Sequence, residues 1–233
     1  MKIGILQCDS ILPDYRDRFD DYPQMIRDLL QRVDPDIETL VYDVENGEYP
    51  DDIDACDAYI TTGSKASVYE DREWIRTLQD FIVQLYQQEK KLAAICFGHQ
   101  LVAQAFGGDT QRSDKGWGVG VHSIDIHTHK PWMDPHRDSI GVLVSHQDQV
   151  LLLPEGAELI AGNPFCPHSM FVYDDRILCI QGHPEFSHDY AEAVMRRRRE
   201  AIGEDRFNSG IESLQSTADS ELLARWLVQF LMG

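Results

Sequence analysis

Short apolar runs rich in valine and isoleucine alternate with longer helical patterns in the first hundred residues, and this alternation restricts the fold more than any other feature. The runs typical of buried strands are 2–6, 39–42, 58–61 and 92–95. Between them, apolar residues recur every three or four positions over 25–33 and 74–86, as in amphipathic helices. Asp71 precedes the second pattern and is expected to cap its helix. Strands joined by helical crossovers lie parallel, so the sequence predicts an α/β sheet with helices on both faces.

The pattern changes after Gly107 and Gly108, a pair suited to closing a helix. Further strands are predicted with no helical pattern between them, at 119–126, 140–145, 169–174 and 177–181. We interpret these strands as an antiparallel extension of the sheet. Two helices are expected to end the chain, one beginning near Ser187 and one with an apolar face over 222–231. Because no linker or repeat interrupts this order, residues 1–233 are predicted to form a single domain.

Charge and cysteine content exclude several classes of function. The chain has 40 acidic and 21 basic residues, a formal net charge of −19, which argues against binding to nucleic acid or to an anionic membrane. No apolar run approaches the length of about 18 residues that reads as a membrane-spanning helix, and the N-terminus lacks a signal-sequence pattern. The five cysteines contain no CxxC pair, as is usual in a reducing compartment. We therefore expect a cytoplasmic protein without a zinc site built from cysteines.

Cys96 lies where a chain could hold a nucleophile. The pattern of small residue, x, nucleophile, x, glycine spans Ala94 to Gly98, between a predicted strand and a predicted helix. The N–H groups at the start of that helix would favour a thiolate and an oxyanion beside it. The alternative is a buried cysteine that only fills space, because free cysteine is among the most buried residue types.

A second motif supplies partners for such a nucleophile. The segment QGHPEF at 181–186 follows a predicted strand and presents His183 and Glu185, separated only by Pro184. A cysteine nucleophile needs a base that takes up its proton, and that base needs an acceptor that fixes its tautomer. Pro184 stiffens the link between the two side chains. Cys96, His183 and Glu185 together predict a catalytic triad.

With these motifs in place, the sequence resembles the class I, or triad-type, glutamine amidotransferases, and most of all their stand-alone GMP-synthase-like branch. The matching segments are ICFGHQL at 95–101, QGHPEF at 181–186, TTGSKASVYED at 61–71 and VSHQDQV at 144–150. The resemblance implies a flavodoxin-like open, mostly parallel sheet. It also implies hydrolysis of the L-glutamine side-chain amide through a γ-glutamyl thioester on Cys96, with His183 as general base and acid and Glu185 as its orienter. Ammonia would pass to a separate acceptor or a synthetase subunit, and no motif implies a metal or an organic cofactor.

The resemblance also assigns substrate-binding roles. The backbone N–H groups of Phe97 and Ser64 would bind the oxyanion, and Gly63 would line the substrate. The positions expected to meet the rest of the glutamine are Gln100, Ser145 and His146. The family has Gly-Gly-Pro where this chain has Gly63-Ser64-Lys65, and many relatives have glycine at Ala94. A side chain at Ser64 is tolerated if its φ stays negative.

The arginine run at 196–199 is interpreted as the solvent-exposed face of a helix rather than an anion site. Glu192 and Glu200 are its expected partners, because such charge runs usually lie in solvent.

Two other functions remain open. A self-contained γ-glutamyl hydrolase would form the same acyl-enzyme but would release a peptide or amine and pass the acyl group to water. An open pocket beyond the scissile amide would favour it, whereas a partner that stimulates glutaminase activity would favour an amidotransferase. A non-catalytic regulatory relative is less consistent with the sequence, because such proteins usually lose part of the triad and this chain retains all of it.

Overall fold

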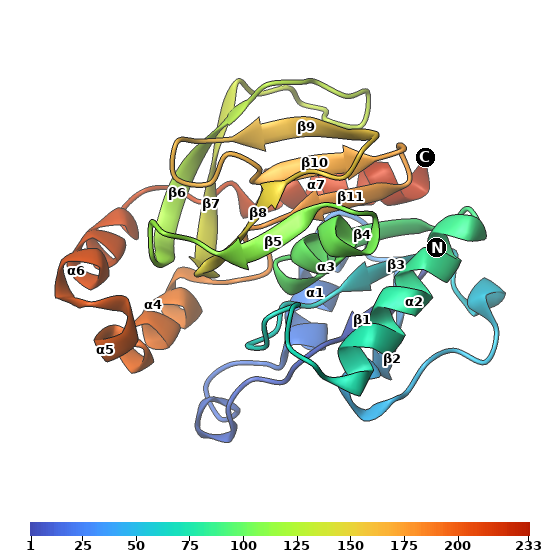
Figure 1. The fold of residues 1–233 in the computed structure, drawn as a ribbon, viewed down its shortest axis with the longest axis horizontal. Coiled ribbons are helices and arrows are strands. Elements are labelled where there is room, and N and C mark those ends of the chain that lie inside the picture. Colours follow the sequence, from blue (N-terminus) through green and yellow to red (C-terminus); the bar gives the residue numbers. More distant parts are fainter.

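A nine-stranded sheet forms the centre of the computed structural model, which describes residues 1–233, and its strand order is β2-β1-β3-β4-β11-β10-β9-β6-β7 (Figure 1). The parallel strands are β1 (Lys2–Gln7), β2 (Glu38–Asp43), β3 (Ala58–Thr61), β4 (Lys91–Ile95) and β11 (Ile177–Ile180). The antiparallel strands are β6 (Gly118–Ile126), β7 (Ser139–His146), β9 (Ala157–Gly162) and β10 (Met170–Tyr173). A second, two-stranded sheet pairs β5 (Asp109–Arg112) with β8 (Asp148–Leu152). The predicted α/β class, a mostly parallel sheet with an antiparallel extension, is therefore confirmed.

Helices cover both faces of the sheet. Helices α1 (Tyr22–Gln31) and α7 (Ser220–Met232) pack on one face, and α2 (Glu73–Gln87) and α3 (Phe97–Ala105) pack on the other. Strand β4 contributes to both cores, with Ala93 and Ile95 in the first and Leu92 and Ala94 in the second. Successive side chains of a strand point to opposite faces, so a strand buried on both is a continuous apolar run. None of the helices is long and apolar enough to cross a bilayer.

The chain ends with more helices than the sequence predicted. Between β11 and α7 lie α4 (His188–Arg197), α5 (Arg199–Ile202) and α6 (Glu204–Ser213), which gather beside β6 and β7 in Figure 1. The prediction of two helices was wrong because α6 is apolar only at Phe207 and Ile211, which pack in one cluster with Val119 of β6. Gly210 adds a close contact with β6, because its backbone lies against Gly120.

The N-termini of α4 and α2 can be compared with the helix caps predicted from the sequence. Ser187 caps α4 as expected, and its side chain accepts a hydrogen bond from the Tyr190 amide at 3.1 Å. Asp71 does not cap α2, because Arg72 occupies the cap position without a side-chain hydrogen bond. Asp71 instead forms an ion pair with Arg76, one turn into the helix.

The carboxyl ends of β1, β3, β4 and β11 lie side by side at one edge of the sheet. In the register of β4 and β11, Ile95 is opposite Ile180, and the Cys96 amide donates to the Ile180 carbonyl at 2.8 Å. The segments that carry Gly63 and His183 leave β3 and β11 at the same edge. Open α/β sheets bind their ligands at this edge, so the fold brings the predicted site residues to the expected place.

Gly98 allows α3 to lie close to β3. A Cβ atom at Gly98 would lie 2.9 Å from the Cβ atom of Thr61 and still closer to its hydroxyl oxygen, which accepts a hydrogen bond from the Ile95 amide at 3.0 Å. Overpacking a well-packed interior typically costs about 1–3 kcal/mol and occasionally more, so we expect Gly98→Ala to lower the free energy of unfolding by about 3 kcal/mol. Urea unfolding of the variant would measure this change.

Gly156→Ala is the control for that substitution. Gly156 has a φ of 86°, but nothing lies within 4 Å of the added Cβ atom. Only backbone strain then opposes alanine, at about 1 kcal/mol. If Gly98→Ala were no more destabilising than Gly156→Ala, close packing against Thr61 would not be the reason for glycine at position 98.

Candidate active site

Cys96 occupies a strained turn between β4 and α3. Its φ is 48° and its ψ is −94°, a combination that residues with a Cβ atom rarely adopt, and the residue is 5% exposed. Such strain at a strand-to-helix turn is characteristic of a nucleophile elbow. Phe97 begins α3, so the free N–H groups of the first helical turn follow the cysteine directly. The structure therefore contains the strand, turn and helix that the sequence predicted around Cys96.

His183 and Glu185 follow β11, the neighbour of β4. The Nδ1 atom of His183 lies 2.7 Å from Oε1 of Glu185, and both residues are buried. Phe186 stacks on the imidazole with 3.9 Å between ring centroids, which fixes the ring plane. Burial by itself lowers the pKa of His183, but the charges of Glu185 and Cys96 outweigh it and raise this pKa from 6.5 to about 10. The imidazole is therefore held as a cation that has a proton to donate at neutral pH.

The turn after β3 brings Gly63 against both of these segments. A Cβ atom at Gly63 would lie 2.9 Å from Cε1 of His183 and 3.6 Å from Cβ of Cys96, so glycine is the residue that fits. The backbone N–H groups of Ser64 and Phe97 donate no hydrogen bond to any protein group. Two free donors beside a nucleophile are suited to stabilising an oxyanion, so the assignment of these two residues to an oxyanion hole stays a prediction.

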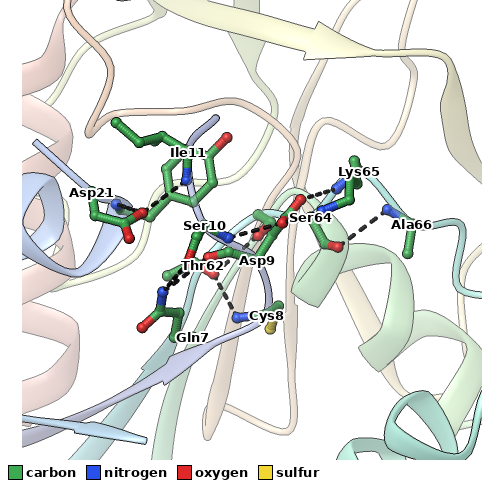
Figure 2. A network of polar contacts seen from close by, with 12 residues as sticks. Gln7, Cys8, Asp9, Ser10, Ile11, Asp21, Thr62, Ser64, Lys65 and Ala66 are labelled. Carbon is green, nitrogen blue, oxygen red and sulfur yellow. Dashed lines mark hydrogen bonds and ion pairs between the residues drawn. The ribbon is translucent and has the colours of Figure 1, made fainter. Parts of the chain in front are cut away.

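A buried carboxylate at the end of β1 fixes the turn at 63–66 (Figure 2). Asp9 is 5% exposed and accepts hydrogen bonds from the Lys65 amide at 3.0 Å and from the Lys65 ammonium at 2.5 Å. Within the turn, Ser64 Oγ accepts from the Ala66 amide at 3.1 Å. Lys65 thus anchors the turn by charge. Asp9 could not be recognised from the sequence, because only the fold brings the end of β1 beside this turn.

Gln181 is a second residue that sequence analysis did not single out. Its Nε2 atom lies 3.6 Å from the Cys96 sulfur, and its Oε1 atom accepts a hydrogen bond from Gln100 at 3.1 Å. The Gln100 amide group also donates to the Asp148 carbonyl at 2.9 Å, and Gln100 does not line the hollow at Cys96. The structure therefore places Gln100 behind Gln181. The sequence feature that could have pointed to Gln181 is its position directly after β11, two residues before His183.

Ser145 and His146, at the end of β7, occupy different environments. Ser145 lines the hollow at Cys96, and its Oγ atom accepts a hydrogen bond from Arg198 at 2.9 Å. His146 is buried, with Nδ1 3.0 Å from the Asp148 carbonyl oxygen. Burial lowers the pKa of His146 to about 3, so its ring is neutral at physiological pH. Of the two side chains, only that of Ser145 faces the nucleophile.

The arginine run is not the uniform solvent-exposed face that the sequence predicted. Arg196 pairs with Glu192 as expected, but Arg199 pairs with Glu204 rather than Glu200. Arg198 is half-buried and turns inward to Ser145, because it ends α4 at the point where this helix packs against β7.

Two adjoining hollows open at this site. The hollow lined by Cys96 and His183 has a volume of about 20 Å³, which is room for about one water molecule. The other has a volume of about 750 Å³. The residues that line both are Tyr22, Lys65, Val194 and Arg198. Nowhere in the chain do three or more His, Cys, Asp or Glu side chains gather in a way that could hold a metal ion.

Comparisons with known proteins bear on the family and the fold of this chain. The model of the family "Glutamine amidotransferase class-I" matches residues 16–199. A glutamine amidotransferase-like protein of Schizosaccharomyces pombe is 31% identical over 99% of this chain and 98% of its own length. Gamma-glutamyl peptidase 3 of Arabidopsis thaliana is 33% identical over 83% of this chain and 82% of its own. The crystal structure of a glutamine amidotransferase from Thermotoga maritima, 16% identical, has a TM-score of 0.76 over 99% of this chain and 95% of that one. The chain therefore belongs to the class I glutamine amidotransferase family.

Proposed function

We propose that the chain hydrolyses γ-glutamyl amide bonds through a thioester on Cys96, with water as the final acceptor. The observation that carries the proposal is the position of Cys96 in a strained elbow. There it lies beside an imidazolium fixed by Glu185 and next to the free backbone amides of Ser64 and Phe97.

The reaction follows from these positions. The Cys96 thiolate attacks the amide carbon, and the carbonyl oxygen becomes an oxyanion held by the two free amides. His183 gives its proton to the leaving nitrogen as the C–N bond breaks, which releases the amine and leaves a γ-glutamyl thioester. A water molecule then attacks the thioester while His183 takes up one of its protons. The C–S bond breaks, glutamate leaves, and the thiolate and imidazolium are restored.

The larger hollow favours a leaving group bigger than ammonia. Glutamine releases only ammonia and needs no space beyond the scissile bond, whereas a hollow of about 750 Å³ adjoins the small hollow at Cys96. The 33% identity to a protein named gamma-glutamyl peptidase supports the same choice. We therefore place γ-glutamyl peptides ahead of L-glutamine as substrates. Glutamine would form the same acyl-enzyme and would supply ammonia to a separate acceptor.

The test compares γ-glutamyl-leucine, its α-glutamyl isomer and L-glutamine with the purified chain alone. We expect γ-glutamyl-leucine to be cleaved about tenfold faster or more, the equivalent of 1.4 kcal/mol of binding in the hollow, and the α-glutamyl isomer to resist cleavage. Mass spectrometry after an acid quench should find one γ-glutamyl group on the peptide that contains Cys96. Absence of cleavage of both γ-glutamyl substrates would contradict the proposal, and faster cleavage of glutamine would favour the amidotransferase.

A further inference from the structure

We propose that the larger hollow binds the amine side of the scissile bond and that Arg198 there binds a free carboxylate. The preferred substrates would then be γ-glutamyl amino acids whose leaving residue is apolar. The inference rests on the proposed function and adds the chemical class of the leaving group.

The position of His183 determines where the leaving amine lies. Its proton must reach the leaving nitrogen, so the amine lies on the His183 side of Cys96, whereas the carbonyl oxygen faces the free backbone amides. Phe186 stacks on His183, and its ring centroid lies 6.1 Å from that of Tyr22 and 4.7 Å from that of Tyr190. Both tyrosines line the larger hollow. A substituent on the leaving nitrogen therefore extends into that hollow.

The wall reached in this way is apolar and aromatic. Its members, from the loop after β1 and from α1 and α4, are Leu12, Tyr15, Tyr22, Tyr190 and Val194. The Tyr190 hydroxyl group donates a hydrogen bond to the Tyr22 hydroxyl oxygen at 3.0 Å. Burial raises the pKa of Tyr22 well above its usual value, so this pair stays uncharged. Such a wall gains free energy by covering an apolar side chain.

Three basic side chains line this hollow, and Arg198 is the one without a carboxylate partner. Lys65 pairs with Asp9 at 2.5 Å, and Arg197 lies 3.8 Å from Asp14. Arg198 forms no ion pair. Its guanidinium donates to Ser145 Oγ at 2.9 Å and lies 5.3 Å from the centroid of the Trp117 ring, which leaves further donors free. A half-buried guanidinium with free donors is suited to binding a carboxylate.

The position of Arg198 also limits the length of the leaving group. Arg198 lines both hollows, so it lies at their junction, close to the reacting bond. In a γ-glutamyl amino acid, the free carboxylate is separated from the scissile nitrogen by only the α-carbon. The side chain on that α-carbon is then free to lie against the apolar wall of the larger hollow. A longer peptide would carry its carboxylate past Arg198.

Two substrates that differ only in the carboxylate test this assignment: γ-glutamyl-leucine and γ-glutamyl-leucinamide. We expect the chain to cleave the carboxylate form with a kcat/KM about 10–100-fold higher, the range given by hydrogen bonds to a charged group. Arg198→Gln should bring this ratio close to one. Arg196→Gln is the matched control from the same run, because Arg196 pairs with Glu192 and lines neither hollow, and it should keep the wild-type ratio.

Three outcomes would overturn the inference. A wild-type ratio near one would mean that the carboxylate is not bound, and this result needs no variant. An unchanged ratio in folded Arg198→Gln would mean that another group binds the carboxylate. An equal loss of kcat/KM for both substrates and for L-glutamine in that variant would place Arg198 on the γ-glutamyl half.

Failure of the proposed function is distinct, because the wild-type chain would then cleave neither substrate. If Arg198→Gln fails to fold, Arg198→Lys keeps the charge and should give an intermediate ratio.

Discussion

Replacing Cys96 by alanine should lower kcat for γ-glutamyl cleavage by about 10⁴-fold or more, because loss of a triad nucleophile leaves only oxyanion stabilisation and substrate binding. The sulfur atom is the one that would carry the acyl group, so no thioester should be found by mass spectrometry. Cys96 is buried at a turn, and removing one sulfur atom leaves the surrounding backbone bonds in place, including the 2.8 Å bond from its amide to Ile180. We expect the free energy of unfolding to change by about 1 kcal/mol at most.

Cys166→Ala is the matched control for this prediction. Cys166 is also buried, and burial raises its thiol pKa to about 11, so it carries little thiolate at neutral pH. Its kcat should therefore stay within about twofold of the wild type, as is usual for residues outside the catalytic unit. A Cys96→Ala protein that retained the wild-type rate would show that the nucleophile is elsewhere.

The parallel half of the sheet and the elbow at Cys96 could be predicted because their signals are local. An apolar run, a small-residue turn and a helical stripe lie next to one another in the sequence over 91–105, and the structure keeps them in that order. The same holds for His183 and Glu185, which are two residues apart and meet directly.

The surroundings of the nucleophile could not be predicted because they depend on contacts between distant segments. Arg196 and Arg198 belong to the same run of arginines, yet one pairs with a glutamate in solvent and the other turns inward. Only the packing of α4 against β7 distinguishes them. Likewise, Asp9 and Lys65 are far apart in the sequence, and the pairing of β1 with β3 brings them into contact.

Replacing Glu185 by glutamine should lower kcat by about 10⁴-fold, as expected when the acid of a triad becomes its amide. In the folded chain the Glu185 carboxylate has one hydrogen-bonding partner, His183, and its other oxygen is buried without one. The charge of Glu185 therefore acts mainly on this imidazole. Without it, only Cys96 opposes the effect of burial, so the pKa of His183 falls and less imidazolium is present to protonate the leaving amine.

The same substitution should change how stability depends on pH. The pKa of His183 is 6.5 when unperturbed and about 10 in the folded chain, so the folded state holds this proton more tightly. That contribution to stability is complete below about pH 6.5 and is lost as the pH rises through about 10. In Glu185→Gln the pKa of His183 is lower than in the wild type, so the stability gained from this proton is smaller. The gap in unfolding free energy between wild type and variant should therefore be largest at pH 6 and narrow toward pH 10.

Urea unfolding of both proteins at pH 6, 8 and 10 would measure this gap, with Glu192→Gln as the control. Glu192 pairs with Arg196 at an exposed position, so its loss should change stability little and to the same extent at each pH. Because the comparison is between two proteins at each pH, the titration of every other group cancels to first order. A gap between wild type and Glu185→Gln that stayed constant with pH would mean that Glu185 does not hold His183 as a cation. The proton for the leaving amine would then have to come from another group.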